Sequence, residues 1–177
     1  MRSTSFVLAA FALAGIVATS GCNNLPMAGL GGSTASSGIL SNASNFITQL
    51  DAARGKALTA TENSAVMSIL TGSSSAASSI QSTFVNNVAV YTGIDPSILS
   101  AAFPSATTAV SDSSLTSTLE SKLGQKLTSA QNISVKAANA LRNNSLDSIK
   151  SSLTNSVASK VGVDATTVSS LLPLLGF

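Results

Sequence analysis

One stretch of this chain occurs twice, and the two occurrences are 69 residues apart. Residues 79–104 read SIQSTFVNNVAVYTGIDPSILSAAFP, and residues 148–173 read SIKSSLTNSVASKVGVDATTVSSLLP. The same offset relates apolar, glycine, aspartate and proline positions within and before this stretch: Gly55/Gly124, Leu58/Leu127, Ile80/Ile149, Val88/Val157, Gly93/Gly162, Asp95/Asp164 and Pro104/Pro173. Matches of these residue types at one constant offset rarely arise by chance. We therefore interpret the chain as a tandem duplication, with copies at residues 46–104 and 115–173.

Each copy is predicted to begin with two helical segments. The first covers residues 45–57 and is matched by residues 115–122, where apolar residues recur at steps of three and four. The second opens with Thr59-Ala-Thr-Glu62 in one copy and Thr128-Ser-Ala-Gln131 in the other, and both patterns are typical of capping boxes. Gly72 and the pair Asn143-Asn144 are predicted to end these second helices.

The third predicted segment is an amphipathic helix, and the fourth is a short helix. The apolar stripe of the third segment has the same spacing in both copies: Ile80, Phe84, Val88 and Tyr91, with Ile149, Leu153, Val157 and Val161. Gly93 and Gly162 are expected to close these helices in the left-handed conformation. Asp95 and Asp164 then precede the fourth helices, which end near the proline of each copy.

These patterns predict an all-α protein in which a duplicated four-helix unit packs as one helical bundle. The bundle would occupy residues 45–177, its two copies would share one core, and residues 105–114 would connect them. Ahead of it we expect a signal peptide at residues 1–21 and a flexible tether rich in Gly and Ser at residues 22–44.

The composition favours an exported protein and argues against nucleic-acid binding. Charged residues make up 9% of the chain, well below the roughly 25% of an average soluble domain. The second copy carries six Lys or Arg residues, but they are scattered through a segment without Tyr, Trp or Phe. Binding to nucleic acid normally needs a dense basic stripe, often with aromatic side chains. We expect these cations to face solvent.

The N-terminus is typical of an export signal. Arg2 precedes an apolar run over residues 6–17, which is shorter than the about 20 residues of a membrane span. The run is followed by Thr19-Ser20-Gly21-Cys22, which resembles the processing site of bacterial lipoproteins, although Thr stands where that class usually has Leu. The resemblance implies cleavage before Cys22 and acylation of this cysteine, with chains such as palmitate.

Cys22 is the only cysteine, so it has no partner for an internal disulfide. The alternative is ordinary signal-peptidase cleavage after a small residue such as Ser20, which would leave a free thiol. Asn23 follows the cysteine where, in the sorting pattern of this class, Asp retains a lipoprotein in the inner membrane. The resemblance thus implies lipid anchoring in the outer membrane, and the alternative is a periplasmic or secreted protein.

Several residues of the repeat admit two interpretations. The pair Asp95 and Asp164 could form a pseudo-symmetric site, but their positions favour helix N-caps. Tyr91 is expected in the core with its hydroxyl at the edge. The equivalent Asn86 and Asn155 could bridge the two copies or face solvent. The C-terminal residues 171–177 are expected to join the core and not to form an exposed docking tail.

The Gly-(Ile/Val)-Asp turn, followed by an aliphatic residue, an apolar pair and Pro, loosely resembles bacterial YidB-like helical proteins. The resemblance covers a short stretch of each copy, and we transfer no function from it.

The sequence does not favour an enzyme. It has no histidine, which removes the common nucleophile pairs, ordinary zinc sites and the most frequent general base. No phosphate-binding loop, dinucleotide fingerprint, nucleophile elbow or EF-hand spacing is present. We therefore expect no catalytic residues, no metal and no cofactor.

The leading hypothesis is a non-enzymatic envelope lipoprotein, anchored in the membrane by acyl chains, that binds or scaffolds another envelope or surface protein. A flat or grooved apolar surface would favour it. The alternative is a carrier or sensor of an apolar small molecule, held between the two repeats. An enclosed cavity would favour this alternative, with four lining residues: Phe84, Phe103, Leu153 and Leu172.

Overall fold

The computed structural model describes residues 37–177, which form an all-α fold and contain no strand. The predicted signal peptide and Cys22 lie outside the described residues. Seven α-helices and a final 3₁₀ helix follow one another: α1 (Ser37–Ser41), α2 (Ala43–Arg54), α3 (Ala60–Thr92), α4 (Pro96–Ala102), α5 (Asp112–Leu123), α6 (Ser129–Val161), α7 (Ala165–Leu171) and η2 (Leu172–Leu175). The predicted fold class, an all-α bundle, is confirmed.

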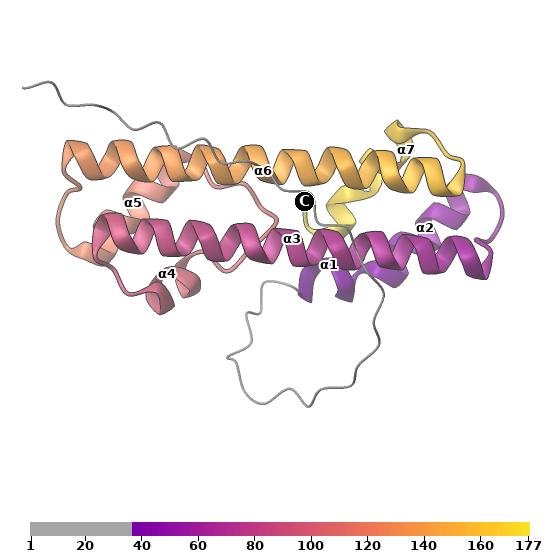
Figure 1. Ribbon diagram of the computed structural model, residues 1–177, viewed down its shortest axis with the longest axis horizontal. Coiled ribbons are helices and arrows are strands. Elements are labelled where there is room, and N and C mark those ends of the chain that lie inside the picture. Colours follow the sequence, from indigo (N-terminus) through magenta and orange to yellow (C-terminus); the bar gives the residue numbers. More distant parts are fainter. Residues whose placement is uncertain (1–36) are drawn as a thin grey trace, which may run out of the picture. The chain divides into compact units, whose positions relative to one another are not determined.

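The two long helices α3 and α6 lie side by side and run in opposite directions (Figure 1). Each replaces two predicted helices, so a copy has three α-helices and not four. Gly72 does not end a helix, and Asn143 and Asn144 lie inside α6. A glycine within a helix costs only about 1 kcal/mol, which packing along the full length of the partner helix outweighs.

The helices of the two copies have equivalent bounds. α2 and α5, α3 and α6, and α4 and α7 each begin and end at positions 69 residues apart. Both capping boxes form, at Thr59 and at Thr128. Gly93 and Gly162 adopt φ angles of 75° and 70°, in the left-handed region that favours glycine. The sequence repeat therefore coincides with a structural repeat, whereas duplication of an ancestral unit stays a prediction.

The side chains that enclose the ends of the long helices form two separate clusters, and not the single shared core that was predicted. The α2–α7 cluster combines α2 and the start of α3 with the end of α6: Phe46, Leu50, Val66, Leu70, Leu153, Val157, Val161, Val168, Leu172 and Leu175. The α4–α5 cluster combines the end of α3 with the start of α6: Phe84, Val85, Val88, Leu99, Phe103, Leu115, Leu119, Val135 and Ala138. Each cluster thus contains residues of both copies. The short helices gather accordingly, α4 and α5 at one end of the long pair and α2 and α7 at the other (Figure 1).

Equivalent residues meet between the two clusters. Ala77 of α3 and Leu146 of α6, which are 69 residues apart, belong to one small buried cluster. Thr107 Oγ1 donates a hydrogen bond of 2.7 Å to the carbonyl oxygen of Gly176, its equivalent in the second copy. Contacts between equivalent positions of antiparallel elements are those of an approximate two-fold axis, which passes near the middle of α3 and α6.

The folded part begins earlier than predicted. The tether was expected to extend to residue 44, but α1 starts at Ser37 and α2 at Ala43. Ile39 and Ala43 are almost fully buried in the α2–α7 cluster. Ile39 on the short α1 and Ala43 at the start of α2 gain burial against a core that the local sequence does not reveal.

Stability is expected to depend on pH through Glu62, which completes the first capping box. The Arg54 guanidinium, with hydrogen bonds from Thr59, lowers the pKa of Glu62 to about 2 from 4.5. A pKa lower in the folded state means that the carboxylate stabilises the fold above about pH 5 and that this contribution disappears as the pH falls toward 2. We expect Glu62→Gln to be less stable than the wild type at pH 7 and nearly equal to it at pH 2.

The measurement is urea unfolding of both proteins between pH 7 and pH 2. The second copy supplies the control, because Gln131 already occupies the equivalent position; Gln131→Ala should lower stability by an amount that does not change with pH. A constant difference between wild type and Glu62→Gln over this range would contradict the prediction.

Candidate functional site

The apolar cavity that was proposed between the repeats is not formed by its predicted residues. Phe84 and Phe103 belong to the α4–α5 cluster, where their rings meet edge to face at 5.9 Å between centroids. Leu153 and Leu172 are buried in the α2–α7 cluster at the other end. Because the copies cross between the two clusters, equivalent residues lie at opposite ends, and the predicted set of lining residues is wrong. Binding of an apolar molecule between the repeats stays a prediction.

The two aspartates take the N-cap positions of α4 and α7, as predicted. Asp95 accepts hydrogen bonds from the backbone N–H and the hydroxyl of Ser97, at 2.7 and 2.5 Å. These bonds lower the pKa of the Asp95 carboxyl, the hydroxyl more than the backbone group. Asp164 occupies the equivalent position, but its side chain makes no capping hydrogen bond.

The structure also decides between the two interpretations of the remaining residues of the repeat and of the C-terminal segment. Tyr91 is 40% exposed, so its prediction as a core residue is wrong; Thr92 is the buried residue at this turn of α3. Asn86 and Asn155 both face solvent and bridge nothing. At the C-terminus Leu172 and Leu175 are buried in the α2–α7 cluster, which confirms the prediction of core packing.

A polar cluster centred on Arg142 holds the connector, residues 103–111, which joins α4 to α5. Arg142 Nη2 donates to the carbonyl oxygens of Ser105 and Thr108, at 2.8 and 3.0 Å. Arg142 Nε donates to Gln81 Oε1 at 2.9 Å, and Gln81 Nε2 donates in turn to the carbonyl oxygen of Phe103. The guanidinium carbon also lies 5.2 Å from the centroid of the Phe84 ring, within the range of a cation–π contact.

Two amides of α6 complete the attachment of the connector. Asn139 Nδ2 and Asn143 Nδ2 both donate to the carbonyl oxygen of Val110, at 2.8 and 3.1 Å. Asn139 Nδ2 also donates to Asp112 Oδ1 at the start of α5. Irregular backbone next to a core needs such partners, because an unpaired buried carbonyl costs about as much as a lost hydrogen bond.

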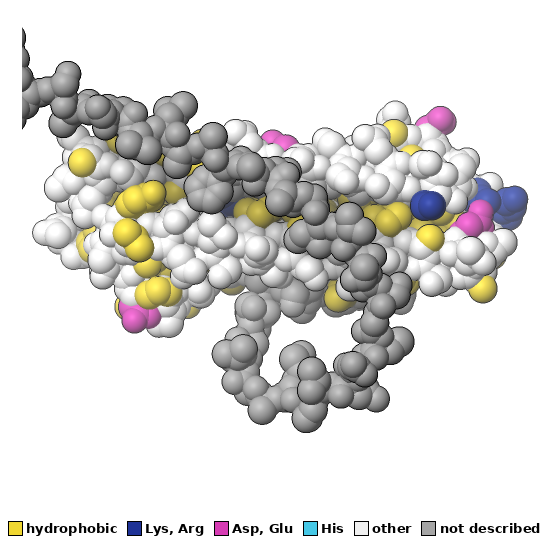
Figure 2. All heavy atoms as spheres, in the orientation of Figure 1, with side chains coloured by type: hydrophobic (Ala, Val, Ile, Leu, Met, Phe, Trp, Pro, Cys, Tyr) yellow, Lys and Arg dark blue, Asp and Glu magenta, His cyan; other side chains and the backbone are white. Residues whose placement is uncertain are grey.

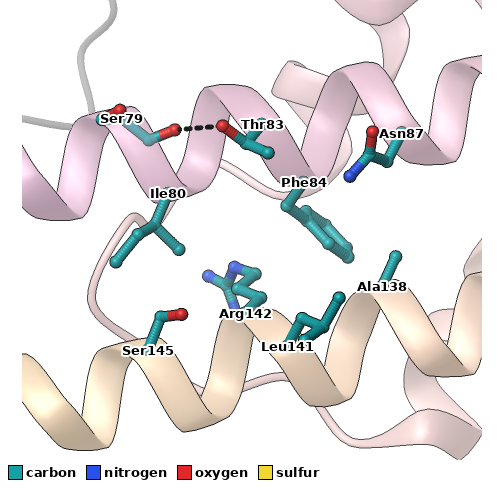
Figure 3. Close-up of a pocket in the computed structure, with 9 residues that line it drawn as sticks. All are labelled: Ser79, Ile80, Thr83, Phe84, Asn87, Ala138, Leu141, Arg142 and Ser145. Carbon is teal, nitrogen blue, oxygen red and sulfur yellow. Dashed lines mark hydrogen bonds between the residues drawn. The ribbon is translucent and has the colours of Figure 1, made fainter. Parts of the chain in front are cut away.

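Arg142 also lines an open hollow between α3 and α6, with a volume of about 150 Å³. Figure 3 shows Ile80 and Phe84 pointing from α3 toward α6, and Arg142 rising from α6 between them. The remaining lining residues are small or polar, apart from Leu141: Ser79, Thr83, Asn87, Ala138 and Ser145. None of the nine lining residues is Asp or Glu, so the hollow combines a buried cation, neutral donors and apolar walls.

A second hollow lies between the same two helices at the equivalent place. Its volume is about 260 Å³, and its lining is related to that of the first by the 69-residue offset: Ile69, Gly72, Ser73, Ala76, Ile149, Ser152 and Leu153. Ser73 stands where the first hollow has Arg142, and Gly72 stands where it has Leu141. The approximate two-fold axis therefore relates a charged hollow to a neutral one.

Apolar side chains are exposed along the same helices. Within residues 37–177, the three most exposed large hydrophobic residues lie on α3 and α6: Val90 at 80%, Ile133 at 71% and Leu141 at 66%. Val90 follows Thr83 by two helical turns and so lies on the same side of α3 as the Arg142 hollow. Figure 2 shows hydrophobic side chains following the line between the two long helices. We call this line, with its two hollows, the α3–α6 seam.

The prediction that the cations of the second copy face solvent is wrong for Arg142, which is 2% exposed. Sequence analysis also missed Gln81 and Asn139. One signal was available, because Arg142 and Asn139 fall on the apolar stripe of α6, between Val135 and Leu146. A cation at helical spacing within an apolar stripe indicates a buried charge that needs partners. The hydrogen-bond partners of Arg142 could not be predicted from local patterns, since Gln81 is 61 residues away in the sequence.

Three further findings bear on function. Residues 37–177 hold no group of three or more His, Cys, Asp and Glu side chains placed to bind a metal ion. Within the same residues, no helix combines the length and the apolar character needed to cross a membrane. Comparisons with models of protein families, with curated proteins and with solved structures find no match to this chain.

Proposed function

We propose that the protein is a non-enzymatic, lipid-anchored protein of the bacterial cell envelope that binds another envelope protein along the α3–α6 seam. The observation that carries the proposal is the seam itself, which joins two hollows and the exposed Val90 and Leu141 on a rigid pair of helices. Grooves between helices with apolar flanks are a common docking surface for an extended or helical segment of a partner. A single acyl chain anchors only weakly, so two or three on Cys22 would be needed to hold the bundle at the membrane.

The seam favours protein binding over the transport of an apolar molecule. Its hollows are open and partly polar, and that of Arg142, at about 150 Å³, is smaller than the roughly 300–1,000 Å³ of typical small-molecule pockets. Of the four residues that were expected to enclose an apolar ligand, Phe84 lines one hollow and Leu153 the other, and all four are packed in the two end clusters. A partner's side chains are a better fit to such small hollows.

The first test concerns Cys22, in membranes of the native host. Intact-mass analysis should give a mature chain that begins at Cys22 and carries added acyl chains. Cys22→Ala should abolish both the added mass and retention in the membrane fraction. An unmodified wild-type mass would contradict the anchor.

The same membranes also test the seam. A photo-crosslinking residue at Val90 should join the chain to one discrete protein, while the same residue at the exposed Ser117 of α5 should not. Equal labelling from both positions would contradict docking on the seam.

A further inference from the structure

The positive charge of Arg142 is buried without a carboxylate partner. Arg142 is 2% exposed, and its hydrogen-bond acceptors are the neutral oxygens of Gln81, Ser105, Thr108 and Asn143. The ion pairs of residues 37–177 use other cations. Burial lowers the pKa of the Arg142 guanidinium, but arginine keeps its charge in proteins. Since buried charges are usually paired, this one calls for an anion.

The geometry leaves part of the guanidinium available to such an anion. Nη1 carries two N–H donors, and its hydrogen bond to Asn143 Oδ1 is 3.5 Å long, against 2.8–3.0 Å for the other bonds of the group. Arg142 faces the hollow beside the hydroxyl of Ser145, with Ile80 and Leu141 as apolar walls (Figure 3). The hydroxyl of Thr83, which also lines the hollow, donates to the carbonyl oxygen of Ser79. A carboxylate there would receive charge-assisted hydrogen bonds, and its aliphatic stem would contact the walls.

We propose that this hollow receives a carboxylate side chain, Asp or Glu, of the protein that docks on the α3–α6 seam. The inference rests on the proposed function and names the chemistry of the partner's anchor. The hollow has room for one side chain, and the carboxylate supplies the charge that Arg142 lacks. A free small carboxylate shares this chemistry, and the experiment below separates the two sources.

The difference between the two hollows would fix the orientation in which a partner binds. The second hollow has Ser73 in place of Arg142 and therefore carries no charge. A partner that occupies both hollows would contact a charged site in one and a neutral site in the other. The hollows are about ten residues apart along α3, which corresponds to roughly 15 Å. Charge complementarity at one of two otherwise similar sites fixes the register of a partner. The partner's acidic residue should therefore lie roughly 15 Å from a neutral side chain that fills the second hollow.

The test is a titration of the full chain carrying Cys22→Ala, followed by ¹⁵N NMR. The probes are N-acetylglutamate N-methylamide and the matched glutamine compound, which differ only in charge and hydrogen-bond pattern. The glutamate probe should shift the signals of Arg142 Nε–H, Thr83 and Ser145 with saturation at millimolar concentration, and the glutamine probe should bind at least about tenfold more weakly. Signals of Ser73 and Ala76 should not move. Equal binding of both probes would overturn the proposal.

A variant that leaves the bonds of Arg142 in place provides the control. Ser145→Glu adds a resident carboxylate to the hollow and should abolish binding of the glutamate probe. Ala76→Glu, the equivalent change at the second hollow, should leave it unchanged. Probe binding that persists in Ser145→Glu would overturn the inference.

Crosslinking in native membranes distinguishes the two proposals. If the discrete partner is crosslinked from Val90 but the glutamate probe does not bind, the carboxylate inference fails and the docking proposal stands. If the probe binds but no partner is crosslinked from Val90, the proposed function fails, and the hollow takes a free carboxylate. If both succeed, Ser145→Glu should also reduce crosslinking of the partner from Val90, and unchanged crosslinking would overturn the inference.

Discussion

Replacing Arg142 with methionine is expected to lower the free energy of unfolding by about 3–5 kcal/mol, because the change leaves three acceptors unpaired in or near the core. These are Gln81 Oε1 and the carbonyl oxygens of Ser105 and Thr108. Methionine fills much of the volume but donates no hydrogen bond. The measurement is urea unfolding of wild type and variant, with hydrogen exchange of residues 103–111 as a second readout.

Lys126→Met is the matched control for this prediction. Lys126 pairs with Glu120 at 2.7 Å, but its side chain is 88% exposed, and such surface pairs contribute only about 0–1 kcal/mol. If Arg142→Met costs no more than this control, water replaces the guanidinium as donor and Arg142 does not hold the connector. Faster exchange confined to residues 103–111 would instead support its role there.

The second large effect is expected at Phe46, which is fully buried where α2 meets the end of α6. Phe46→Ala should lower the free energy of unfolding by about 3–5 kcal/mol, through lost burial and the cavity that remains. The loss of protection from hydrogen exchange should reach the end of α6, although that segment belongs to the other copy. Urea unfolding and hydrogen exchange measure the two effects.

Val90→Ala provides the comparison at an exposed position of α3. Val90 is 80% exposed, so the change should alter stability by no more than about 0.5 kcal/mol. A similar effect of Phe46→Ala would mean that α2 is not part of the core. Exchange confined to residues 43–54 would show that the cluster does not couple the two copies.

The ends of the helices could be predicted from local sequence patterns. The capping residues Thr59 and Thr128, and the closing glycines Gly93 and Gly162, act on backbone groups a few residues away, so their effect can be deduced from the sequence. Because the copies are related by an offset of 69 residues, each helix boundary predicted in one copy also predicted the equivalent boundary in the other. These signals explain why the fold class and the start and end of the long helices could be predicted.

The continuity of the long helices could not be predicted from the same rules. Gly72 resembles a helix end in sequence, but the helix continues because both of its halves are packed. Apart from the neighbouring backbone of α3, no atom lies within 4 Å of a Cβ built at Gly72, so the position has no steric need for glycine. Asn143 sits within α6 because its side chain bonds to the distant carbonyl of Val110. Tyr91 was misplaced for a related reason, since the direction of the buried face depends on how α3 meets α6.

The candidate site depended even more on distant contacts. Arg142 binds residues that are 34 to 61 positions away, and the hollow at its side exists only where two helices of different copies cross. No pattern within either helix encodes that crossing. The 69-residue offset does align Arg142 with Ser73 in the sequence. Only the structure shows that these two residues line equivalent hollows, one of which is charged and the other neutral.

The mixed composition of the two end clusters has a consequence for how the bundle folds. In a linear repeat array each unit contacts its neighbours and gains stability one unit at a time. Here neither copy can complete a cluster alone, since Phe46 needs Val157 of the other copy and Phe84 needs Val135. Closing either cluster joins residues that are far apart in the sequence, 111 positions for Phe46 and Val157 and 51 for Phe84 and Val135, so chain entropy is lost before burial compensates for it. We expect the bundle to fold and unfold as one cooperative unit, in which the repeat of the sequence is not a unit of stability.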